Sequence, residues 1–592
     1  MSINTDAIIK EFAAVKTRRA PWELVWDLVC KYVLMRKRGF TKATADGTFY
    51  MYGDVYDDTA IKSNNQMVSS LAGALWKNGA RTFRIVKPRS VADSEAVKVF
   101  YKEANERTVR QMEHPKAGFS TSFSEYLLEQ GSLGTSGFGT FKAKDGSDHI
   151  LEYKACGLRG LYVVEDANGQ VSKNFFEVEL NAFQVVEEYG EVGKTANVKS
   201  AIDSQNRDTK FKVLWVIQPR LDYDAKIKNN LNMPYESVHI LEEENVQLRE
   251  SGFRELPIKV TRFYKNDGEE YGRSPGMESL PSNIELNAIW EIITKGGELD
   301  MDPSLYLLDD GSFGGVLDRS PGALNVLDIS SRISNTSPIG IVGPPGDPSK
   351  LLKLLEVLTN QIVSHFFVDR LLDLNNKTRM TLGEAQIRNE MRAESLGSVY
   401  MRQIDECLTP TIKRSIGILV EVGEFGTIQG SEEGIALTAA GKTPVYLPQE
   451  LVDAQARGEE IYNIEYISPA ARILQSEEVR GIMSTWQFAG TFAAVAPEFM
   501  IRLNKKWSLE RVAELTGATR DVLLSDDEFD KEWKAYQEAQ QQAAQLQMQR
   551  MSAEIAAKQG SAAQQNAQAV ATQAGGGGGG APGGMGTGGM LL

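Results

Sequence analysis

The spacing of apolar and polar positions changes along the chain and divides it into regions. Over residues 1–130, apolar positions recur at steps of three and four, which predicts helices over 6–32, 64–76 and 91–112. Trp22 and Trp26, four positions apart, are expected on one face of the first of these helices. Residues 131–265 change to short apolar runs separated by Gly, Asn and Asp. This pattern predicts strands at 131–143, 161–171, 210–219 and 256–264.

Helical spacing returns at residues 277–293 and again at 349–372. Between these two segments, residues 296–348 are rich in Gly, Pro, Asp and Ser, with short strand-like runs at 304–310 and 323–329. The sequence therefore predicts a small β-containing excursion flanked by two long helices.

Residues 378–414 read as one long helix with two different halves. The first half carries mixed charges around its circumference: Glu384, Arg388, Glu390, Arg392 and Glu394. The second half has an apolar stripe at steps of three and four: Leu396, Val399, Tyr400, Ile404, Cys407 and Leu408. A helix that is packed at one end and polar all round at the other is typical of a bridge between partners or subunits.

The C-terminal part is predicted to be helical and then flexible. Shorter helices are expected near 476–494, 509–516 and from Asp526 onward, where Ser525 and Glu528 form a capping-box pattern. The last helix is rich in Ala and Gln and is expected to run to about Lys558, roughly 50 Å. Its apolar content is thin, so we expect it to pack beside copies of itself. Residues 575–592 are Gly-rich and read as a flexible tail.

Composition narrows the classes of protein that fit. Hydrophobic residues make up 42% of the 592-residue chain and charged residues 24%, which is ordinary for a folded protein. Lys and Arg number 65 against 79 Asp and Glu, so the net charge is −14, which disfavours tight binding to nucleic acid phosphates. We expect no membrane span and no signal peptide. The three cysteines, far apart in sequence, favour a reducing compartment over a disulfide framework.

Candidate chemical motifs are weak in their sequence context. Residues 436–443 fit a relaxed phosphate-loop pattern, but Pro444 and Pro448 exclude the regular helix that should follow, so a surface loop is favoured. The glycine-rich segment 131–139 follows a predicted helix and not a strand, which favours a turn. The four histidines lack metal-ligand spacing, and Asp309-Asp310 reads as a solvated turn. We therefore expect no catalytic residues, no cofactor and no metal.

Several short motifs occur in an order that is typical of one protein family. They are Arg19–Glu23 (RAPWE), Leu71–Trp76, Leu256–Ile258 with Arg262, Gly268–Ser274 (GEEYGRS), Arg379–Thr381 with Glu384, Leu408–Pro410 and Glu465–Arg472 (EYISPAAR). Together they resemble the portal proteins of tailed bacteriophages, most closely the head-to-tail connectors of short-tailed phages. The resemblance covers nearly the whole chain, although Trp76-Lys77 stands where the family usually has Phe-Pro.

The resemblance implies a mixed α+β, predominantly helical fold with the wing, stem, clip and crown of phage portals, assembled as a ring of about twelve copies. The implied regions are a wing with a β-rich part (1–270), a first stem helix (271–295), a clip (296–348), a second stem helix (349–372), a tunnel loop (373–381), a long wing helix (382–424), a crown (425–525), a C-terminal helix or barrel (526–574) and a flexible tail (575–592).

The resemblance also implies roles for particular residues. The tunnel loop facing DNA would contain Asn375, Asn376, Lys377, Thr378 and Arg379. The clip contacting motor and tail would contain Asp309, Asp310, Phe313, Asp318 and Arg319. The helix between subunits would contain Glu384, Arg388, Glu390 and Arg392.

Function and partners follow from the same resemblance. The expected role is a non-enzymatic ring at one capsid vertex through which double-stranded viral DNA is packaged and ejected. Expected partners are further copies of the chain, the DNA, terminase, major capsid and scaffolding proteins, tail proteins and internal core proteins, with no membrane. The expected location is the virion, after assembly in the host cytoplasm.

Two other classes of protein remain open at this stage. One is a scaffolding or coiled-coil assembly protein built on the Ala/Gln-rich helix, against which the β-rich section 131–264 speaks. The other is an ATP-driven packaging motor subunit, which needs a phosphate loop in a better context than 436–443.

Overall fold

The computed structural model describes residues 4–35, 40–41, 55–76, 82–88, 90–92, 94–144, 146–205, 209–224, 227, 229, 231–301, 305–307, 339–341, 349–371, 397–430, 434, 444–466, 469–492, 502–516 and 526–573. The chain divides into two compact units, Met1–Glu478 and Val479–Leu592. Each unit is described separately below.

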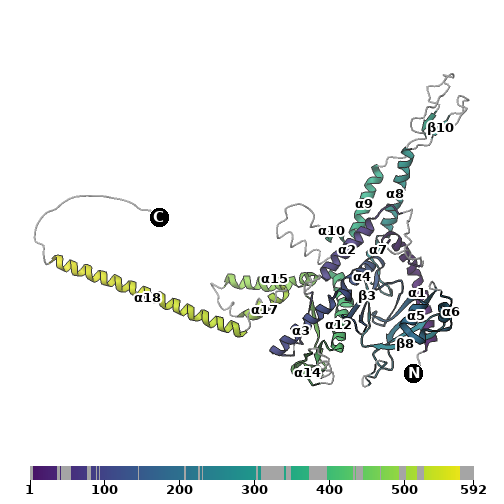
Figure 1. Cartoon of the computed structure of the whole chain (residues 1–592). Helices are drawn as coiled ribbons and strands as arrows, with labels where there is room; N and C mark the ends of the chain where they lie inside the picture. Colours follow the sequence, from purple (N-terminus) through teal and green to yellow (C-terminus); the bar gives the residue numbers. More distant parts are fainter. Residues whose placement is uncertain are drawn as a thin grey trace, which may run out of the picture. The chain divides into compact units, whose positions relative to one another are not determined.

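Helices make up much of the described chain (Figure 1). The α-helices are α1 (Thr5–Tyr32), α2 (Thr59–Leu75), α3 (Glu95–Met112), α4 (Phe119–Leu133), α5 (Ala182–Tyr189), α6 (Ala196–Asp203), α7 (Pro275–Glu278), α8 (Leu280–Met301), α9 (Ser349–His365), α10 (Val368–Leu371), α12 (Thr409–Val422), α14 (Gln449–Ala456), α15 (Pro469–Phe492), α17 (Lys505–Thr516) and α18 (Asp526–Gln573). Two 3₁₀ turns, η1 (Pro115–Ala117) and η2 (Gly190–Gly193), and a π-helical turn, η4 (Gln403–Leu408), accompany them.

The strands lie in the first unit. They are β1 (Phe83–Val86), β2 (Thr135–Lys142), β3 (Leu151–Cys156), β4 (Leu161–Glu165), β5 (Val171–Asn181), β6 (Lys210–Pro219), β7 (Tyr235–Leu241), β8 (Val246–Phe253), β9 (Ile258–Arg262), β10 (Leu305–Leu307), β11 (Ile339–Ile341), β12 (Phe425–Thr427), β13 (Val445–Tyr446) and β14 (Asn463–Tyr466). The described structure is thus mixed α and β, as the sequence predicts.

Two antiparallel sheets form the β-rich part. Strands β4 to β8 follow one another in sequence order in a five-stranded sheet, and β3-β2-β9 form a three-stranded sheet. One face of the larger sheet is covered by α1, where Phe12 lies 4.9 Å from the ring of Tyr162 and 5.3 Å from that of Phe175. Helices α5 and α6 cover a separate apolar cluster that includes Phe211 and Val213 of β6.

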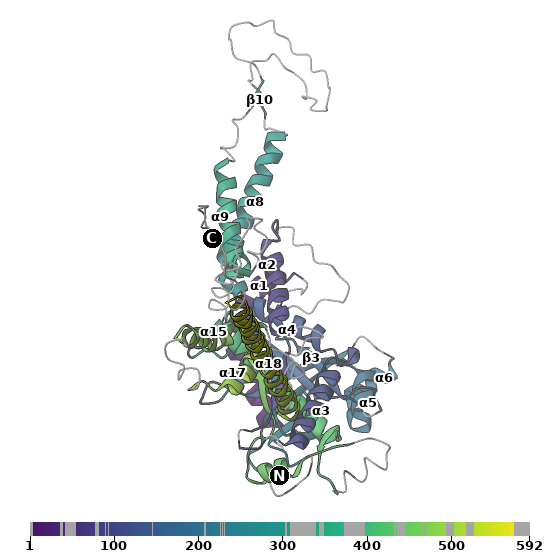
Figure 2. The same ribbon diagram turned by 90° about the vertical axis from the view of Figure 1, so that its left-hand side faces the viewer.

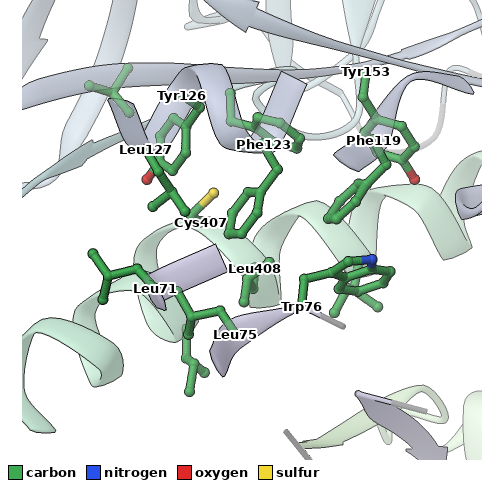
Figure 3. Packing of buried hydrophobic residues seen from close by; sticks show 14 of the residues in the cluster. Leu71, Leu75, Trp76, Phe119, Phe123, Tyr126, Leu127, Tyr153, Cys407 and Leu408 are labelled. Atoms are coloured by element: carbon green, nitrogen blue, oxygen red, sulfur yellow. The ribbon is translucent and has the colours of Figure 1, made fainter. Parts of the chain in front are cut away.

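The main core is aromatic and is built on α4. Phe119, Phe123 and Tyr126 of this helix are almost fully buried and point toward α2, β3 and the helix that contains Cys407 (Figure 3). The ring of Phe119 lies 4.3 Å from that of Trp76 and 5.0 Å from that of Tyr153. Full burial of each large side chain is worth about 1.5–3 kcal/mol, so α4 contributes strongly to the stability of the first unit.

A short sheet connects residues that are very distant in sequence. Strand β1 pairs antiparallel with β14, with Phe83 opposite Tyr466 and Val86 opposite Asn463. The guanidinium of Arg84 donates a hydrogen bond of 2.9 Å to the Glu465 carboxylate across this pair. This pairing places Glu465 and Tyr466, the first residues of the Glu465–Arg472 motif, beside β1, which packs against α3.

The structure revises several predicted boundaries. The helix predicted over 349–372 ends at His365 and resumes at Val368, because Phe367 has a positive φ of 58°. The helix predicted over 378–414 contains the π turn η4 in its described part and continues to Val422, near the end at 424 that the resemblance implies for the wing helix. Helix α18 runs to Gln573, beyond the expected end near Lys558. Helices α5 and α6 and strands β3, β7 and β8 were not predicted.

Other predictions are confirmed or lie outside the described residues. Trp22 and Trp26 stack on α1 with ring centroids 5.9 Å apart, and β10 lies within the predicted strand 304–310. The strand predicted at 323–329 and the segment 436–443 are outside the described residues. In the part of the chain that the structure describes, the helices are too short or too polar to cross a membrane.

Candidate functional site

The residues predicted to carry function lie outside the described part of the chain. They are Asp309, Asp310, Phe313, Asp318 and Arg319 of the clip, Asn375, Asn376, Lys377, Thr378 and Arg379 of the tunnel loop, and Glu384, Arg388, Glu390 and Arg392 of the inter-subunit helix. Their roles stay predictions. The structure does describe the elements that flank these three segments, namely α8, α9, α10 and the helical residues from Gly397 onward.

Helices α8 and α9 form an antiparallel hairpin that extends from the first unit (Figures 1 and 2). At 22 residues, α8 is roughly 33 Å long. Its contact with α9 is apolar: Leu286 and Ile289 of α8 are buried, as are Leu355, Leu358 and Ile362 of α9. At the far end of the hairpin, β10 and β11 pair antiparallel, with Leu305 opposite Ile341. The excursion predicted over 296–348 therefore contains this short ladder, but its first residues, up to Met301, belong to α8.

Buried amides fasten the base of this hairpin to the rest of the unit. The side-chain oxygen of Asn287 accepts hydrogen bonds from the backbone N–H of Tyr56 (2.7 Å) and of Asp57 (3.1 Å). The Asn287 side-chain nitrogen donates to the Asn283 carbonyl at 2.8 Å, and the Asn283 nitrogen donates to the Ser279 hydroxyl at 3.0 Å. Because both amides are nearly inaccessible to water, losing them leaves buried groups without partners.

The motif Gly268–Ser274 forms the turn into the hairpin, and its glycine is required by close contact. A Cβ atom on Gly272 would lie 2.6 Å from the Gly134 carbonyl oxygen and 2.7 Å from the Cβ of Arg262. The Gly272 N–H donates to the Thr135 hydroxyl at 2.7 Å. The Ser274 hydroxyl then caps α7 by accepting from the Met277 N–H at 3.0 Å. This motif thus sets the position at which α8 leaves the core.

The hairpin also exposes apolar side chains. Ile284 and Ile292 on α8 are 43% and 57% exposed, and Ala288 between them is also exposed, so the three form a stripe at steps of four. On α9, Leu352 and Val357 are 53% and 51% exposed. Exposed apolar stripes on a folded helix indicate an interaction surface.

The end of the hairpin is held in an unfavourable backbone conformation. Phe366 is fully buried, while Phe367 adopts the left-handed region, which costs a bulky residue roughly 1–3 kcal/mol. Helix α10, which follows, packs against α2. The backbone of Phe367 therefore separates α9 from α10, the last element described before residue 372.

The described chain resumes at Gly397 in helical residues that lead into the π turn η4. Gln403 at its start is buried; its side-chain nitrogen donates to the Gln130 side-chain oxygen at 2.8 Å, and its own oxygen accepts from the Tyr126 hydroxyl at 2.8 Å. Cys407 in the same turn is fully buried beside Tyr126 (Figure 3), and burial raises the pKa of its thiol to about 12. π turns are frequent where a helix must present particular residues. Here the π turn brings the polar side chain of Gln403 and the apolar side chain of Cys407 into the main core around α4.

Helix α12 is fixed further along by an arginine. The Arg414 guanidinium donates to the backbone carbonyls of Thr140 (2.8 Å) and Glu255 (3.1 Å). Burial lowers the pKa of Arg414 to about 10, so it stays charged at neutral pH. The Ser415 and Tyr153 hydroxyls are hydrogen-bonded at 2.7 Å. The predicted apolar stripe is therefore buried at Val399, Tyr400, Ile404, Cys407 and Leu408, whereas Leu396 lies outside the described residues.

The ionisable groups of the described chain serve packing and ion pairing. Within the described residues, His, Cys, Asp and Glu form no group of three or more suited to a metal ion. His114 and His149 stack with their centroids 5.7 Å apart, and His149 hydrogen-bonds to Asp148 at 3.1 Å. His239 stacks on Trp215 and hydrogen-bonds to the Tyr189 hydroxyl, and burial lowers the pKa of His239 to about 4.

Sequence reasoning missed the buried amides and the π turn. Asn283 and Asn287 have helical spacing within an apolar stretch, and this signal of a buried polar pair was available in the sequence. The π turn leaves no comparable signal, because its extra residue is accommodated by the surrounding core.

Comparisons with known proteins find relatives over most of the chain. Residues 5–523 match the family described as bacteriophage head to tail connecting protein. The portal protein of Salmonella phage epsilon15 is 24% identical over 535 residues, covering 88% of this chain and 89% of that protein. The probable portal protein of Bordetella phage BPP-1 is 24% identical over 574 residues, covering 94% and 95% of the two chains.

A solved structure gives a weaker comparison. A chain from the virion of a native gene transfer agent particle is 12% identical and covers 66% of this chain and 91% of its own length, with a TM-score of 0.29. A TM-score this low does not establish a shared fold. The match to the family over residues 5–523 is decisive: the chain belongs to the bacteriophage head-to-tail connecting proteins.

Proposed function

We propose that this chain is a phage portal protein, which forms a ring at one vertex of the capsid and lets the viral genome pass through its centre. The observation that carries the proposal is the match of residues 5–523 to the head-to-tail connecting family. It is supported by the two phage relatives that are named portal proteins and are covered over most of their length.

The described surface supports self-assembly. In addition to the α8 stripe of Ile284 and Ile292, helix α1 exposes Leu24 (71%) and Leu28 (44%), which lie one turn apart. These are two different apolar surfaces on two different helices. Repeated contact between unlike surfaces closes into a ring when the rotation between copies divides a full turn. The α8–α9 hairpin would then act as the stem. The part of residues 296–348 that follows Met301, which includes the tip strands β10 and β11, would act as the clip.

The charge of the chain supports a conduit that does not grip its cargo. A net charge of −14 in each copy repels DNA over most of a ring's surface. Translocating DNA must slide, so a few basic side chains such as Lys377 and Arg379 would touch phosphates transiently and without sequence readout. The tunnel loop 373–381 is proposed to supply them.

The remaining partners follow from the proposed position in the virion. The clip would face the terminase motor during packaging and tail proteins afterwards, while the wing would face the major capsid and scaffolding proteins. The crown and the C-terminal helix would face the capsid interior and any core proteins. Assembly would take place in the host cytoplasm, and packaging force would come from terminase and not from this chain.

The test is the assembly state of the purified full-length chain. We expect light scattering to give a mass of about twelve copies and negative-stain images to give closed rings with a central hole. A chain that remains monomeric at every concentration, or that forms open filaments, would overturn the proposal.

An ATPase assay on the same purified chain tests the alternative that the protein is an ATP-driven packaging motor subunit. Turnover at the rate of a packaging motor would favour the motor subunit over the portal. A purely helical scaffolding protein is disfavoured by the five-stranded sheet of the first unit.

A further inference from the structure

A proline sets the shape of the helix that contains η4. Pro410 has no N–H to donate to the carbonyl of Glu406, four residues earlier, and in an α-helix its ring would clash with that carbonyl. A proline in a helix most often causes a kink or an end. Here the helix widens instead, and the Thr409 N–H donates to the carbonyl of Ile404, five residues back. The π turn therefore holds one residue more than an α-helix needs to span the same distance.

The two sides of this turn are fastened unequally. On the C-terminal side, Arg414 and Ser415 of α12 make hydrogen bonds of 2.7, 2.8 and 3.1 Å to other elements of the core. On the N-terminal side the polar contacts are longer. The Arg402 guanidinium donates to the Phe263 carbonyl at 3.3 Å and lies 3.7 Å from the Glu406 carboxylate. The helix is thus fixed at α12 and held more loosely before the turn.

The turn itself leaves polar groups poorly satisfied. The Glu406 carboxylate accepts a hydrogen bond from the Arg262 N–H that is 3.4 Å long, and burial raises the pKa of Glu406. Gln403 makes two hydrogen bonds of 2.8 Å. Its partner Gln130, however, keeps a buried side-chain nitrogen that has no hydrogen-bond partner among the described residues. A polar network that is only partly satisfied gives up part of its stabilisation, so the core has a weak point at this turn.

The sequence before the turn fits two registers. If the turn narrowed to an α-helix, each position before it would be taken by the next residue of the chain, after a rotation of about 100° and a shift of about 1.5 Å. Tyr400 would then take the site of Val399, and Met401 the site of Tyr400. In the structure Val399 and Tyr400 are 4% and 7% exposed, and Met401 is 45% exposed. Because these three consecutive residues are large and apolar, both buried sites stay filled after the shift.

The neighbouring positions also exchange like for like. Ser398 would take the buried position of Gly397, so a small residue replaces a small residue. Gln403 would take the position of Arg402, where its amide can also donate to the Phe263 carbonyl. The cost of the shift is the pair of hydrogen bonds that Gln403 makes with α4. This cost makes the register of the structure the more populated one.

The contacts of this helix lead directly to the base of the α8–α9 hairpin. Arg402 donates to the carbonyl of Phe263, next to the end of β9, and η4 packs against β9. The following residue, Tyr264, exchanges two backbone hydrogen bonds with Arg273, of 3.0 and 2.8 Å. Arg273 lies in the turn from which α7 and α8 start. A change of register at η4 therefore acts on the entry of the hairpin through residues 262–264.

We propose that η4 is a two-register joint. In one register the turn holds the spare residue. In the other, the turn narrows, the residues from Gly397 to Arg402 advance by one position, and the end of β9 moves the entry of the hairpin with them. A packed helix that shifts between two discrete positions is a common basis for switching. The joint goes beyond the proposed function and rests on it only for its use: in a portal it would link the helix after the proposed tunnel loop to the base of the proposed stem.

Two variants set the register in opposite ways. Pro410→Ala restores the missing N–H and removes the clash, so it should favour the narrow turn roughly a hundred-fold. Pro410→Ala combined with deletion of Asp405, an exposed residue of the turn, also removes the spare residue, so an α-helix keeps Val399 and Tyr400 in the sites that the structure gives them. The two variants are matched, because they share the proline substitution and differ only in the residue that the shift consumes.

Thiol labelling of the full-length chain with a maleimide reads the register. The three natural cysteines are buried and supply a slow internal reference. With the natural turn, we expect the thiol of Met401→Cys to react rapidly and that of Val399→Cys slowly, as their exposure in the structure requires. Pro410→Ala should raise the labelling rate at Val399→Cys roughly ten- to hundred-fold and lower it at Met401→Cys, and the added deletion should reverse both changes. Labelling that rises at both positions together, and at the natural Cys156, would show loosening of the core and overturn the joint.

Hydrogen exchange tests the link to the hairpin. Exchange in peptides that cover residues 262–280 should differ between the two variants, whereas peptides from β6 and β7 should exchange alike. Opposite labelling patterns without this difference would overturn the link between η4 and the hairpin. Closed rings in negative stain, with labelling that does not respond to either variant, would reject the joint and leave the portal function intact. Opposite labelling in a chain that forms no rings would support the joint and reject the portal ring.

Discussion

Adding charge to the exposed stripe of α8 should prevent the first unit from assembling without unfolding it. The perturbation is the double variant Ile284→Glu/Ile292→Glu. The two isoleucines are 43% and 57% exposed, which together amounts to about one whole isoleucine side chain. Burying that surface against another copy is worth about 1.5–3 kcal/mol. Losing this burial lowers the affinity of each contact between copies roughly ten- to hundred-fold. The cost of burying two carboxylates adds to this loss.

The assay is mass photometry or analytical ultracentrifugation over a series of protein concentrations. We expect the double variant to sediment as a monomer where the natural sequence forms closed assemblies. Its circular dichroism and thermal midpoint, compared under conditions that keep both proteins monomeric, should match, because both side chains already face water in the single chain. Asn360→Glu is the matched control: it adds a carboxylate to an exposed polar position of the same hairpin and should leave assembly unchanged.

One result would refute the reasoning. If the double variant assembles at the same concentration as the natural sequence, the α8 stripe is not buried between copies. If Asn360→Glu prevents assembly as fully as the double variant, the effect is one of charge on the hairpin and not of the apolar stripe.

Three further predictions concern the stability of the first unit. Asn287→Ala removes the acceptor for the Tyr56 and Asp57 N–H groups and should lower the free energy of unfolding by about 1–3 kcal/mol in a denaturant titration. The control variant Ser282→Ala, which removes a surface hydroxyl of the same helix, should leave that free energy almost unchanged. Gly272→Ala places a Cβ 2.6 Å from the Gly134 oxygen and should lower the free energy of unfolding by about 1–3 kcal/mol. Gly297→Ala, which has open space around it, should be neutral or slightly stabilising. Equal thermal midpoints for the two variants would contradict the close contact at Gly272. Burial lowers the pKa of His239 to about 4, against about 6.5 in the unfolded chain. The unfolded chain therefore binds more protons than the folded chain between these two pH values. The stability present above pH 6.5 should fall as the pH is lowered toward 4, by up to about 3 kcal/mol. In urea titrations across this pH range, His239→Gln should flatten the dependence of stability on pH.

The fold was predictable where a single element carries its own pattern. The apolar steps of α1, with Trp22 and Trp26 on one face, and the run that became β6 identify a helix and a strand without tertiary information. The short helices α5 and α6 were missed, since at eight residues each their amphipathic pattern is brief and depends on packing against β6.

The interruptions could not be read from the sequence in the same way. Nothing in the apolar run 349–372 marks Phe367 as left-handed; the break coincides with burial of Phe366 in the main core. Likewise, the partners of Gln403 belong to α4, more than 270 residues earlier, so its role follows from the tertiary structure alone. The predicted site residues were located by family resemblance, and their local context, the hairpin and its anchors, is what the structure adds.

The pairing of β1 with β14 has a consequence for biosynthesis. Arg84 and Glu465, which meet across this pair, are 381 positions apart. At about 5–20 residues per second, a ribosome takes roughly 20–75 s to make the intervening chain. During that interval Phe83 and Ile85, both 1% exposed in the finished unit, have no partner strand. The nascent protein therefore presents an open, apolar strand edge for tens of seconds, and its yield in the cell depends on keeping that edge away from other chains until residue 466 emerges.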